Sequence, residues 1–164
     1  MENLIPGHMS DQELDWLAER ARKMSSIVEI GAFKGRTTYE LCSNCPGVVV
    51  AVDDFRGIYN DEMVGEDLYA EFWKNCGHFK NLITVKAPSV LAAEMIGTAD
   101  MVFIDGTHEE DFVVADLLAW KPHVKKLLCG HDYTINWPGV VRAVDRIVGP
   151  GIGTMVSIWY KEIL

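Results

Sequence analysis

The sequence predicts one doubly wound α/β domain, in which a mostly parallel sheet is flanked by helices. Short β-branched runs alternate with amphipathic segments along the whole chain, as expected for a parallel sheet covered by helices. The chain has 164 residues, and one domain commonly takes roughly 100–200 residues. No internal repeat, linker or low-complexity tract interrupts the order of the segments. We therefore expect residues 1–164 to form a single domain.

The helices are predicted from apolar residues at helical spacing and from signals at the helix ends. Ser10 and Glu13 form a capping box, so a leading helix is expected over about 10–23. Pro138 suits a first helical turn, and Gly149-Pro150 ends the helix that follows it. The remaining helices are expected at 36–41, 61–76, 88–96 and 109–120.

The strands are predicted from short runs rich in β-branched and other apolar residues. Trp120 lies at helical spacing with other apolar residues and Trp159 alternates within a strand, so both are expected in the core. The predicted strands are 26–30, 48–52, 82–85, 101–104, 126–129 and a terminal strand at 155–159.

The charge balance argues against nucleic acid as a partner. The 15 Lys and Arg residues and 24 Asp and Glu residues give a net charge of -9, and no basic run is present. No apolar stretch reaches about 18 residues, so no membrane-spanning helix is expected. Because the N-terminal residues lack a signal-peptide pattern, we expect a cytoplasmic protein with reduced cysteines.

Four short segments are expected to form a binding site. In doubly wound sheets, ligands bind beyond the carboxyl ends of the strands, where the strand order reverses. The residues that directly follow the predicted strands are therefore the candidates. They are 29–37, 53–54, 105–108 and 131–133.

The turn after the first strand carries one acid and two glycines. Glu29 lies at the end of the strand, and Gly31 and Gly35 allow a ligand to approach the backbone closely. A nicotinamide dinucleotide fingerprint would need glycine in place of Phe33 and Arg36. The sequence therefore argues against a nicotinamide dinucleotide at this turn.

Two acids follow the second strand. Asp53 lies 24 residues beyond Glu29, where nucleotide-binding α/β folds place a carboxylate that accepts from a ribose diol. Asp54 follows directly, and only one of two adjacent side chains can point toward the same site. The sequence thus predicts a ribose-binding carboxylate here and leaves both acids as candidates.

These motifs together resemble those of the class I S-adenosylmethionine-dependent methyltransferases. The E-x-G-x-x-x-G turn at 29–35 and the acid after the second strand carry the resemblance. It narrows to the small-domain family grouped with the macrocin and rhamnosyl O-methyltransferases and the cephalosporin-hydroxylase-like proteins. Where that family usually shows D-G-D-H, this chain has Thr107 as the third residue. The segments similar to this family are 103–108, 130–133 and 139–145.

The resemblance implies a Rossmann-like fold with a shortened C-terminal end and S-adenosylmethionine as the cofactor. The cofactor-binding half would be about 26–97 and the acceptor-side half about 100–164. Asp105 would lie beneath the sulfonium, and Ala87 to Ser89 at the adenine edge. The other residues that the resemblance assigns to the cofactor are Glu29, Gly31, Gly35, Thr37, Asp53 and Asp54.

The catalytic candidates follow the fourth and fifth strands: Asp105, His108, His131 and Asp132. Because the cofactor supplies the reactive methyl group, the protein mainly positions two partners and removes a proton. A histidine near a carboxylate would act as general base, although His131 could equally be a structural loop residue. Alternatively, Asp105 and Asp132 would hold a divalent cation such as magnesium. Metal-dependent relatives of the catechol O-methyltransferase kind have an acid or amide where this chain has Tyr133.

The leading hypothesis is methyl transfer to a hydroxyl of a small molecule or sugar. One alternative is a cofactor-binding module without turnover of its own, and another is a hydroxylase-like relative of the same fold. Little of the chain remains outside the sheet to hold an acceptor, so a homo-oligomer would be one way to add a lid. Trp137 lies in a loop on the acceptor side and is a candidate for stacking on a ring.

The cysteines give a separate hypothesis. Cys42 and Cys45 end one predicted helix, and Cys76 and His78 end the next. Right-handed crossovers place these two helix ends on the same side of the sheet. The four side chains could therefore meet as zinc ligands, although Cys-x-His is tighter than the usual ligand spacing. The sequence favours unliganded thiols in loops over this zinc site.

Overall fold

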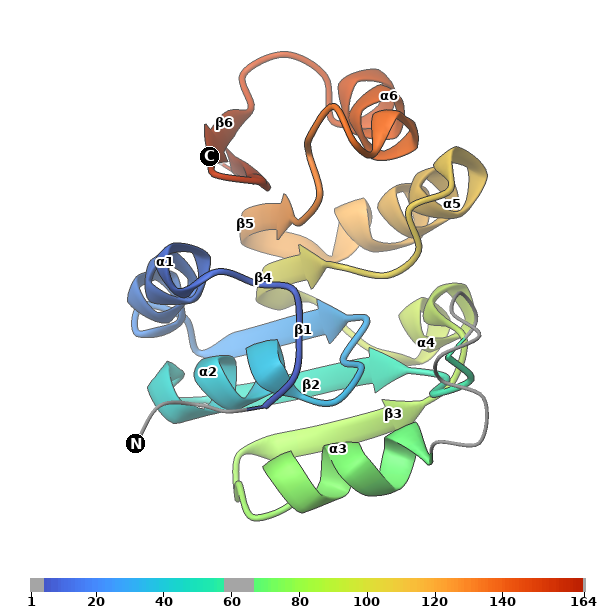
Figure 1. The fold of residues 1–164 in the computed structure, drawn as a ribbon. Coiled ribbons are helices and arrows are strands. Elements are labelled where there is room, and N and C mark those ends of the chain that lie inside the picture. Colours follow the sequence, from blue (N-terminus) through green and yellow to red (C-terminus); the bar gives the residue numbers. More distant parts are fainter. Residues whose placement is uncertain (1–4, 58–66, 164) are drawn as a thin grey trace.

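The computed structural model describes residues 5–57 and 67–163, which form a seven-stranded sheet between two layers of helices (Figure 1). The strand order is β3-β2-β1-β4-β5-β7-β6. Strands β1 to β5 are parallel, whereas β7 runs antiparallel to both β5 and β6. The strands are β1 (Ser26–Ile30), β2 (Val48–Asp53), β3 (Leu82–Lys86), β4 (Ala99–Ile104), β5 (Val124–Gly130), β6 (Gly153–Met155) and β7 (Ile158–Glu162).

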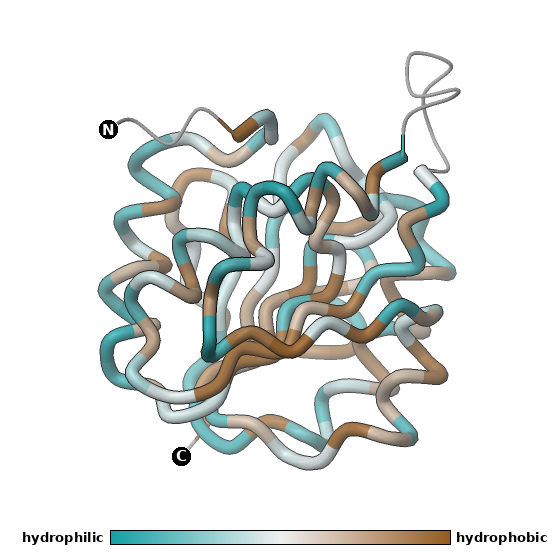
Figure 2. The backbone as a smooth tube through the Cα atoms, turned by 90° about the horizontal axis from the view of Figure 1, so that it is seen from below, coloured by the Kyte–Doolittle hydropathy of each residue, from teal (hydrophilic) through white to brown (hydrophobic). Residues whose placement is uncertain are grey.

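Helices cover both faces of the sheet, with α1, α2 and α3 on one face and α4, α5 and α6 on the other (Figure 1). The hydrophobic stretches of the chain concentrate in the central strands (Figure 2). Among the described residues, no helix has the length and apolar character needed to cross a bilayer. The helices are α1 (Asp11–Ala21), α2 (Arg36–Asn44), α3 (Leu68–Cys76), α4 (Ser89–Met95), α5 (Glu110–Trp120) and α6 (Pro138–Ile147), with the short η2 (Lys121–His123) after α5.

Alternate residues of the central strands pack against opposite helical layers, as the pleat of a strand requires. In β1, Ile27 packs with α1 and α2, whereas Val28 packs with α4, α5 and α6. The same alternation places Glu29 on the α2 side of the sheet. Trp120 and Trp159 are both buried in the cluster under α4 to α6, which confirms the prediction that they belong to the core.

The predicted N-terminal helix and its cap are confirmed. Ser10 is the N-cap of α1, and the reciprocal hydrogen bonds between Ser10 and Glu13 form a capping box. The helix predicted over 61–76 is observed from Leu68 onward, and residues 61–66 lie outside the described residues.

The single terminal strand predicted at 155–159 is wrong. The structure divides this segment between β6 and β7, which form an antiparallel hairpin. Val156 has a φ of 54°, in the left-handed region that turns the chain away from an extended conformation. The run of apolar residues therefore looks like one strand in the sequence although its backbone reverses in the middle.

The strand order reverses between β1 and β4, and the loops after these two strands touch each other. Asp105 N–H donates to Ile30 O over 2.8 Å, and Gly31 N–H donates to Val52 O over 2.9 Å. Gly31 has a φ of 87°, and a Cβ atom there would overlap the carbonyl oxygen of Asp105. Only glycine permits this close approach, which sets the floor of the site at the carboxyl ends of the strands.

Replacing Gly31 by alanine should destabilise the protein by more than about 3 kcal/mol, because steric overlap adds to the cost of a left-handed alanine. Gly149 also has a positive φ, of 74°, but has nothing within 4 Å of a built Cβ. Gly149→Ala therefore measures backbone strain alone and should cost about 1–2 kcal/mol. Gly97→Ala, with open space and no positive φ, should change stability by less than about 0.5 kcal/mol. Denaturant unfolding checks these values, and equal losses at Gly31 and Gly149 would contradict the steric argument.

Candidate functional site

A cavity of about 820 Å³ opens at the carboxyl ends of β1, β2 and β4. The glycine turn, the acids after β2, the start of α4 and the loops after β4 and β5 form its walls. His8 and Met9, from the segment before α1, also line it. The predicted site residues that line this cavity are Gly31, Thr37, Asp53, Asp54, Ser89, Asp105, His108, His131 and Asp132.

Arg36 holds the segment before α1 against this cavity. Its Nε donates to Met9 O over 3.2 Å, and Nη1 donates to Ile5 O over 3.1 Å. Its Nη2 lies 3.2 Å from Asp11 Oδ1. The guanidinium at the start of α2 thus fixes one wall of the cavity.

Asp53 holds the glycine turn in shape. Its Oδ2 accepts from the N–H groups of Ala32 and Phe33, each over 2.8 Å, and its Oδ1 accepts from Phe55 N–H over 2.7 Å. Phe33 and Phe55 have φ values of 48° and 56°, which residues with a side chain rarely adopt. Burial raises the pKa of Asp53 above its ordinary value, although the three N–H donors lower it in part. This carboxylate therefore stabilises two loops at once.

Asp54 is engaged differently, although it directly follows Asp53. Its Oδ1 accepts from Arg56 N–H over 3.0 Å, and its Oδ2 lies 3.0 Å from Arg56 Nε. Both Asp54 and Arg56 line the cavity, and the Arg56 side chain is largely exposed. Asp54 therefore presents to the cavity a carboxylate that is paired with a surface arginine.

Glu29 and Gly35 lie beneath the cavity rather than in its wall. Glu29 is 0% exposed, and its Oε2 accepts from Thr38 Oγ1 over 2.5 Å. Its Oε1 is buried without a hydrogen-bond partner in the described part of the chain. Burial raises the pKa of Glu29 to about 8 despite the hydrogen bond from Thr38, so the carboxyl is mostly neutral at pH 7. Gly35, with a φ of 90°, is the N-cap residue of α2.

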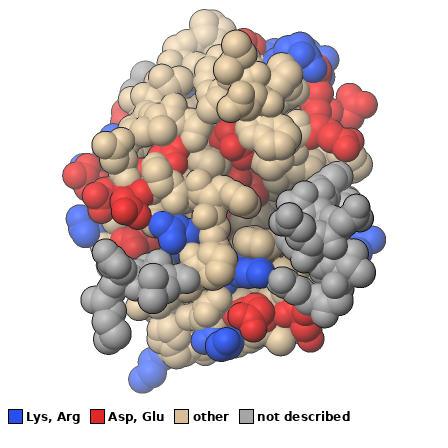
Figure 3. All heavy atoms as spheres, viewed as in Figure 1, with Lys and Arg blue, Asp and Glu red and all other residues tan. Residues whose placement is uncertain are grey.

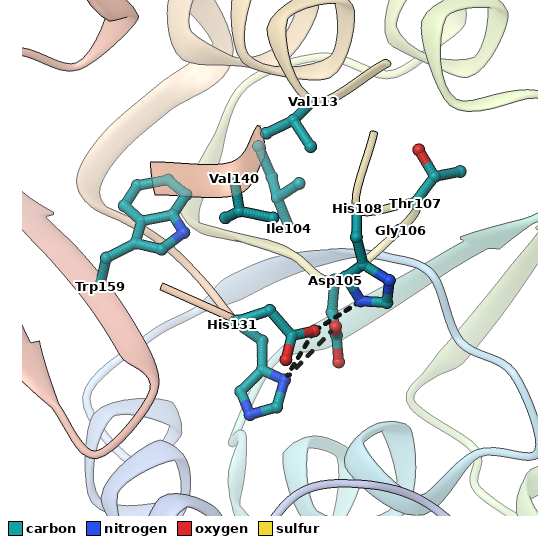
Figure 4. Close-up of a pocket in the computed structure, with 10 residues that line it drawn as sticks. Ile104, Asp105, Gly106, Thr107, His108, Val113, His131, Val140 and Trp159 are labelled. Carbon is teal, nitrogen blue, oxygen red and sulfur yellow. Dashed lines mark hydrogen bonds and ion pairs between the residues drawn. The ribbon is translucent and has the colours of Figure 1, made fainter. Parts of the chain in front are cut away.

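Two histidines and two acids form a cluster at the ends of β4 and β5 (Figure 4). His108 Nε2 lies 2.6 Å from Asp132 Oδ2. His131 Nδ1 lies 3.3 Å from the same oxygen and 3.6 Å from Asp105 Oδ1. Asp132 Oδ2 therefore bridges the two imidazoles, and the structure brings all four catalytic candidates together.

Two residues that the sequence analysis did not identify hold the other nitrogen of His131. His131 Nε2 lies 3.2 Å from Glu13 Oε1 and 2.9 Å from Ser157 Oγ. Ser157 donates its N–H, over 3.0 Å, and its hydroxyl to Glu13 Oε1. Because that hydroxyl hydrogen is already used, Ser157 Oγ accepts from His131. Glu13 Oε2 meanwhile accepts from Ser10, so one carboxylate caps α1 and holds the imidazole.

The surrounding carboxylates keep His131 in its cationic form. Burial lowers its pKa, but the hydrogen bonds to Asp105 and Asp132 outweigh burial and raise it to about 11. The resulting stabilisation is complete below the ordinary pKa of 6.5 and is lost as the pH rises through about 11. The hydrogen bond to Asp132 also raises the pKa of His108, whose side chain is 34% exposed. His108 can therefore exchange a proton with a ligand while His131 keeps its own.

The predicted metal ligands Asp105 and Asp132 do meet, together with His131. Within residues 5–57 and 67–163 this is the one group of such side chains with ligand atoms close enough to share an ion. However, His131 Nδ1 lies between the two carboxylates and donates its proton toward them. A protonated imidazole cannot ligate a metal. A bound cation would displace that proton, so a divalent cation at Asp105 and Asp132 stays a prediction, and no step of the reaction is assigned to it.

The cysteines do not assemble a zinc site in the described part of the chain. Cys45 and Cys76 each donate to a backbone carbonyl over 3.3 Å. The ring of His78 packs against Phe79, with centroids 4.2 Å apart. All of these residues belong to the described part of the chain, and they form no group with the spacing of metal ligands. Cys42, Cys45 and Cys76 are buried free thiols.

Trp137 stacks on His108, with ring centroids 4.0 Å apart and an interplanar angle of 22°. It precedes α6, lines the cavity and is partly exposed. The indole thus fixes the plane of the imidazole and offers an aromatic wall beside it.

Comparison with known proteins gives one family match. A protein-family model described as "Methyltransferase domain" matches residues 28–133. No curated protein sequence matches the chain.

Several solved structures share the fold. CalS11, a calicheamicin methyltransferase, has a TM-score of 0.64 at 17% identity, over 91% of this chain and 76% of that one. An O-methyltransferase from Bacillus cereus in complex with SAH has a TM-score of 0.70 at 14% identity, over 95% and 83%. A precorrin 8w decarboxylase of Methanobacterium thermoautotrophicum has a TM-score of 0.69 at 16% identity, over 97% and 94%. At these identities the likeness establishes the fold.

Replacing Glu13 by glutamine should reduce the free energy of unfolding at pH 7 by about 2 kcal/mol, since it weakens hydrogen bonds to a charged group. Burial raises the pKa of Glu13, but hydrogen bonds from Ser157 and Ser10 lower it to about 2. The difference from wild type should therefore be largest above pH 4.5 and shrink as the pH falls toward about 2. Glu19→Gln, an exposed change on the same helix, is the control. A decrease in the free energy of unfolding that does not depend on pH would contradict the role of Glu13 as an ionised acceptor.

Proposed function

Since the chain belongs to the methyltransferase domain family, and is therefore an S-adenosylmethionine-dependent methyltransferase, we propose that it methylates a hydroxyl group of a small-molecule acceptor. The observation that carries this proposal is that His108, backed by Asp132, opens into the same cavity as the glycine turn. A proton acceptor beside a cofactor-sized cavity favours catalysis over a module that only binds its cofactor.

The cavity fits S-adenosylmethionine in size and in chemistry. Its volume of about 820 Å³ is within the range of roughly 300–1,000 Å³ found for small-molecule sites. Gly31 keeps the loop after β1 free of a side chain. The carboxylates of Asp54 and Asp105 line the same space and suit a ribose diol and a positive charge, respectively. Asp53 supports the turn between them.

The residues of the cluster have separate tasks in the transfer. When bound, S-adenosylmethionine supplies a methyl group on a cationic sulfur, so the acceptor oxygen mainly has to lose its proton. His108 accepts that proton at the ring nitrogen available to the cavity, and Asp132 orients its imidazole and stabilises the charge that forms. Trp137 restrains the ring plane and provides an aromatic wall for the acceptor. His131 and Asp105 keep Asp132 in place.

The choice of a hydroxyl acceptor agrees with the names of structural relatives. A putative O-methyltransferase from Klebsiella pneumoniae and the O-methyltransferase from Bacillus cereus share the fold. On the face shown in Figure 3, lysines and arginines lie apart, between acids, rather than in one basic patch. This distribution supports a small molecule over nucleic acid as the acceptor. A cytoplasmic location and a homo-oligomer stay predictions.

Asp54→Asn should weaken the binding of S-adenosylhomocysteine about tenfold, because the charged acceptor for the ribose is lost. The thermal midpoint should stay within about 1 °C of wild type. Asp53→Asn should lower both affinity and thermal midpoint, since one amide group then faces backbone donors. Calorimetric titration and thermal unfolding measure the two effects. Equal changes in affinity and in thermal midpoint for the two variants would contradict the assignment of ribose binding to Asp54 and of loop support to Asp53.

The rate of methyl transfer to a hydroxyl compound, measured as formation of S-adenosylhomocysteine, should increase as the pH passes the raised pKa of His108. The reason is that only the neutral imidazole accepts a proton. Asp132→Asn replaces the charged acceptor that raises this pKa by a neutral one, so the rising limb of the pH–rate profile should shift to lower pH. His108→Gln should lower the rate by about 10²–10⁴ and leave the binding of S-adenosylhomocysteine within about twofold. A full rate in the His108 variant would exclude it as the base.

A further inference from the structure

Asp116 is a buried carboxylate in the cavity wall that has no role in the site described so far. It lies on the inner face of α5, between the apolar residues Val113, Leu117 and Trp120. Its exposed fraction is 8%, and it lines the cavity. Within the described residues, no ion pair with Lys or Arg offsets its burial. Burying a carboxylate in this way is costly, so a group that binds there should be able to donate hydrogen bonds.

Ser89 orients this carboxylate and is itself fully engaged. Trp120 Nε1, which can only donate, donates to Ser89 Oγ over 2.8 Å. The one hydroxyl hydrogen of Ser89 is therefore directed to Asp116, with which it forms a side-chain hydrogen bond. Ser89, predicted to contact the adenine edge, thus acts through Asp116.

The neighbouring backbone leaves space for the carboxylate. Asp116 Oδ2 would lie 3.3 Å from a Cβ atom built on Gly106, so a side chain at that position would crowd it. Gly106 follows Asp105 and lines the same cavity. The carboxylate is therefore positioned between the loop after β4 and the start of α4.

Apolar side chains flank this part of the cavity. Val90 of α4 and Phe112 of α5 both line it and are 42% and 52% exposed. Pro88 and Ala115 line it as well. Two apolar walls with one acceptor at the edge match a flat heteroaromatic ring that carries an amino group. The Gly31 turn and Asp54, to which the ribose of the cofactor is assigned above, line other parts of the same cavity.

We propose that Asp116 accepts a hydrogen bond from the exocyclic amino group of the cofactor's adenine and so selects adenine over purines that lack this group. This inference rests on the proposed function. An ionised carboxylate has only acceptors. Burial raises the pKa of Asp116 to about 6, against the hydrogen bond from Ser89. The carboxylate is therefore ionised at about pH 8.

The test compares two ligands by calorimetric titration at about pH 8. One is S-adenosylhomocysteine, and the other is its analogue with hydrogen in place of the 6-amino group. Wild type should bind the analogue at least about tenfold more weakly, because a buried acceptor is then left unpaired. Asp116→Ala should bind both ligands within about twofold of each other. Asp111→Ala, an exposed change on the same helix, should keep the wild-type preference.

The outcomes separate this inference from the proposed function. If wild type binds both ligands equally, or Asp116→Ala keeps the tenfold preference, Asp116 does not recognise the amino group. If wild type binds neither ligand, the proposed function itself fails. Should Asp116→Ala not fold, as judged by circular dichroism, Asp116→Asn replaces it with S-inosylhomocysteine as the second ligand. The carboxamide of this variant can donate to the 6-oxygen of S-inosylhomocysteine, so its preference for S-adenosylhomocysteine should be about tenfold or more below that of wild type. An unchanged preference would overturn the inference.

Discussion

A protonated imidazole enclosed by carboxylates is the interaction on which the site depends. His131 meets Asp105 and Asp132 at one ring nitrogen and Glu13 at the other. These groups come from α1 and from the loops after β4 and β5, so one side chain joins three separate parts of the fold. Taking such charges out of water is costly, and hydrogen bonds on both ring nitrogens offset that cost. The result is a rigid support for Asp132, and through it for His108.

The acids at the cavity show that environment, and not residue type, decides what a carboxyl group does. Glu29 is buried beside a single hydroxyl and is mostly neutral. Asp53 is only partly buried, and three backbone donors engage it so that it shapes two loops. Asp54 remains partly exposed at the cavity. The same principle distinguishes the two histidines of the cluster, since the side chain of His108 is 34% exposed whereas that of His131 is 4% exposed and has partners at both ring nitrogens.

The fold could be predicted from the sequence because its signals are local. Strand and helix periodicity, the Ser10 cap and the glycine turn each depend on residues within a few positions of one another. The C-terminal hairpin could not be predicted, since no residue in the apolar run indicates the left-handed conformation of Val156. Within the site, the sequence places side chains at strand ends but not their directions. It therefore gave no sign of Glu13 beside His131, 118 positions away, and it left the roles of Asp53 and Asp54 open.

The contact between Glu13 and Ser157 joins the first helix to the last hairpin across 144 positions of the chain. Contacts of such long sequence separation carry a large loop-closure cost in entropy and slow the folding of a chain. During synthesis, α1 and its cap can form early, yet Glu13 lacks its partner until the final strands have left the ribosome. The sheet and the cofactor-facing loops can therefore be built before the electrostatic centre of the site is complete. Assembly of that centre is in this sense a late event that follows synthesis of the hairpin formed by β6 and β7.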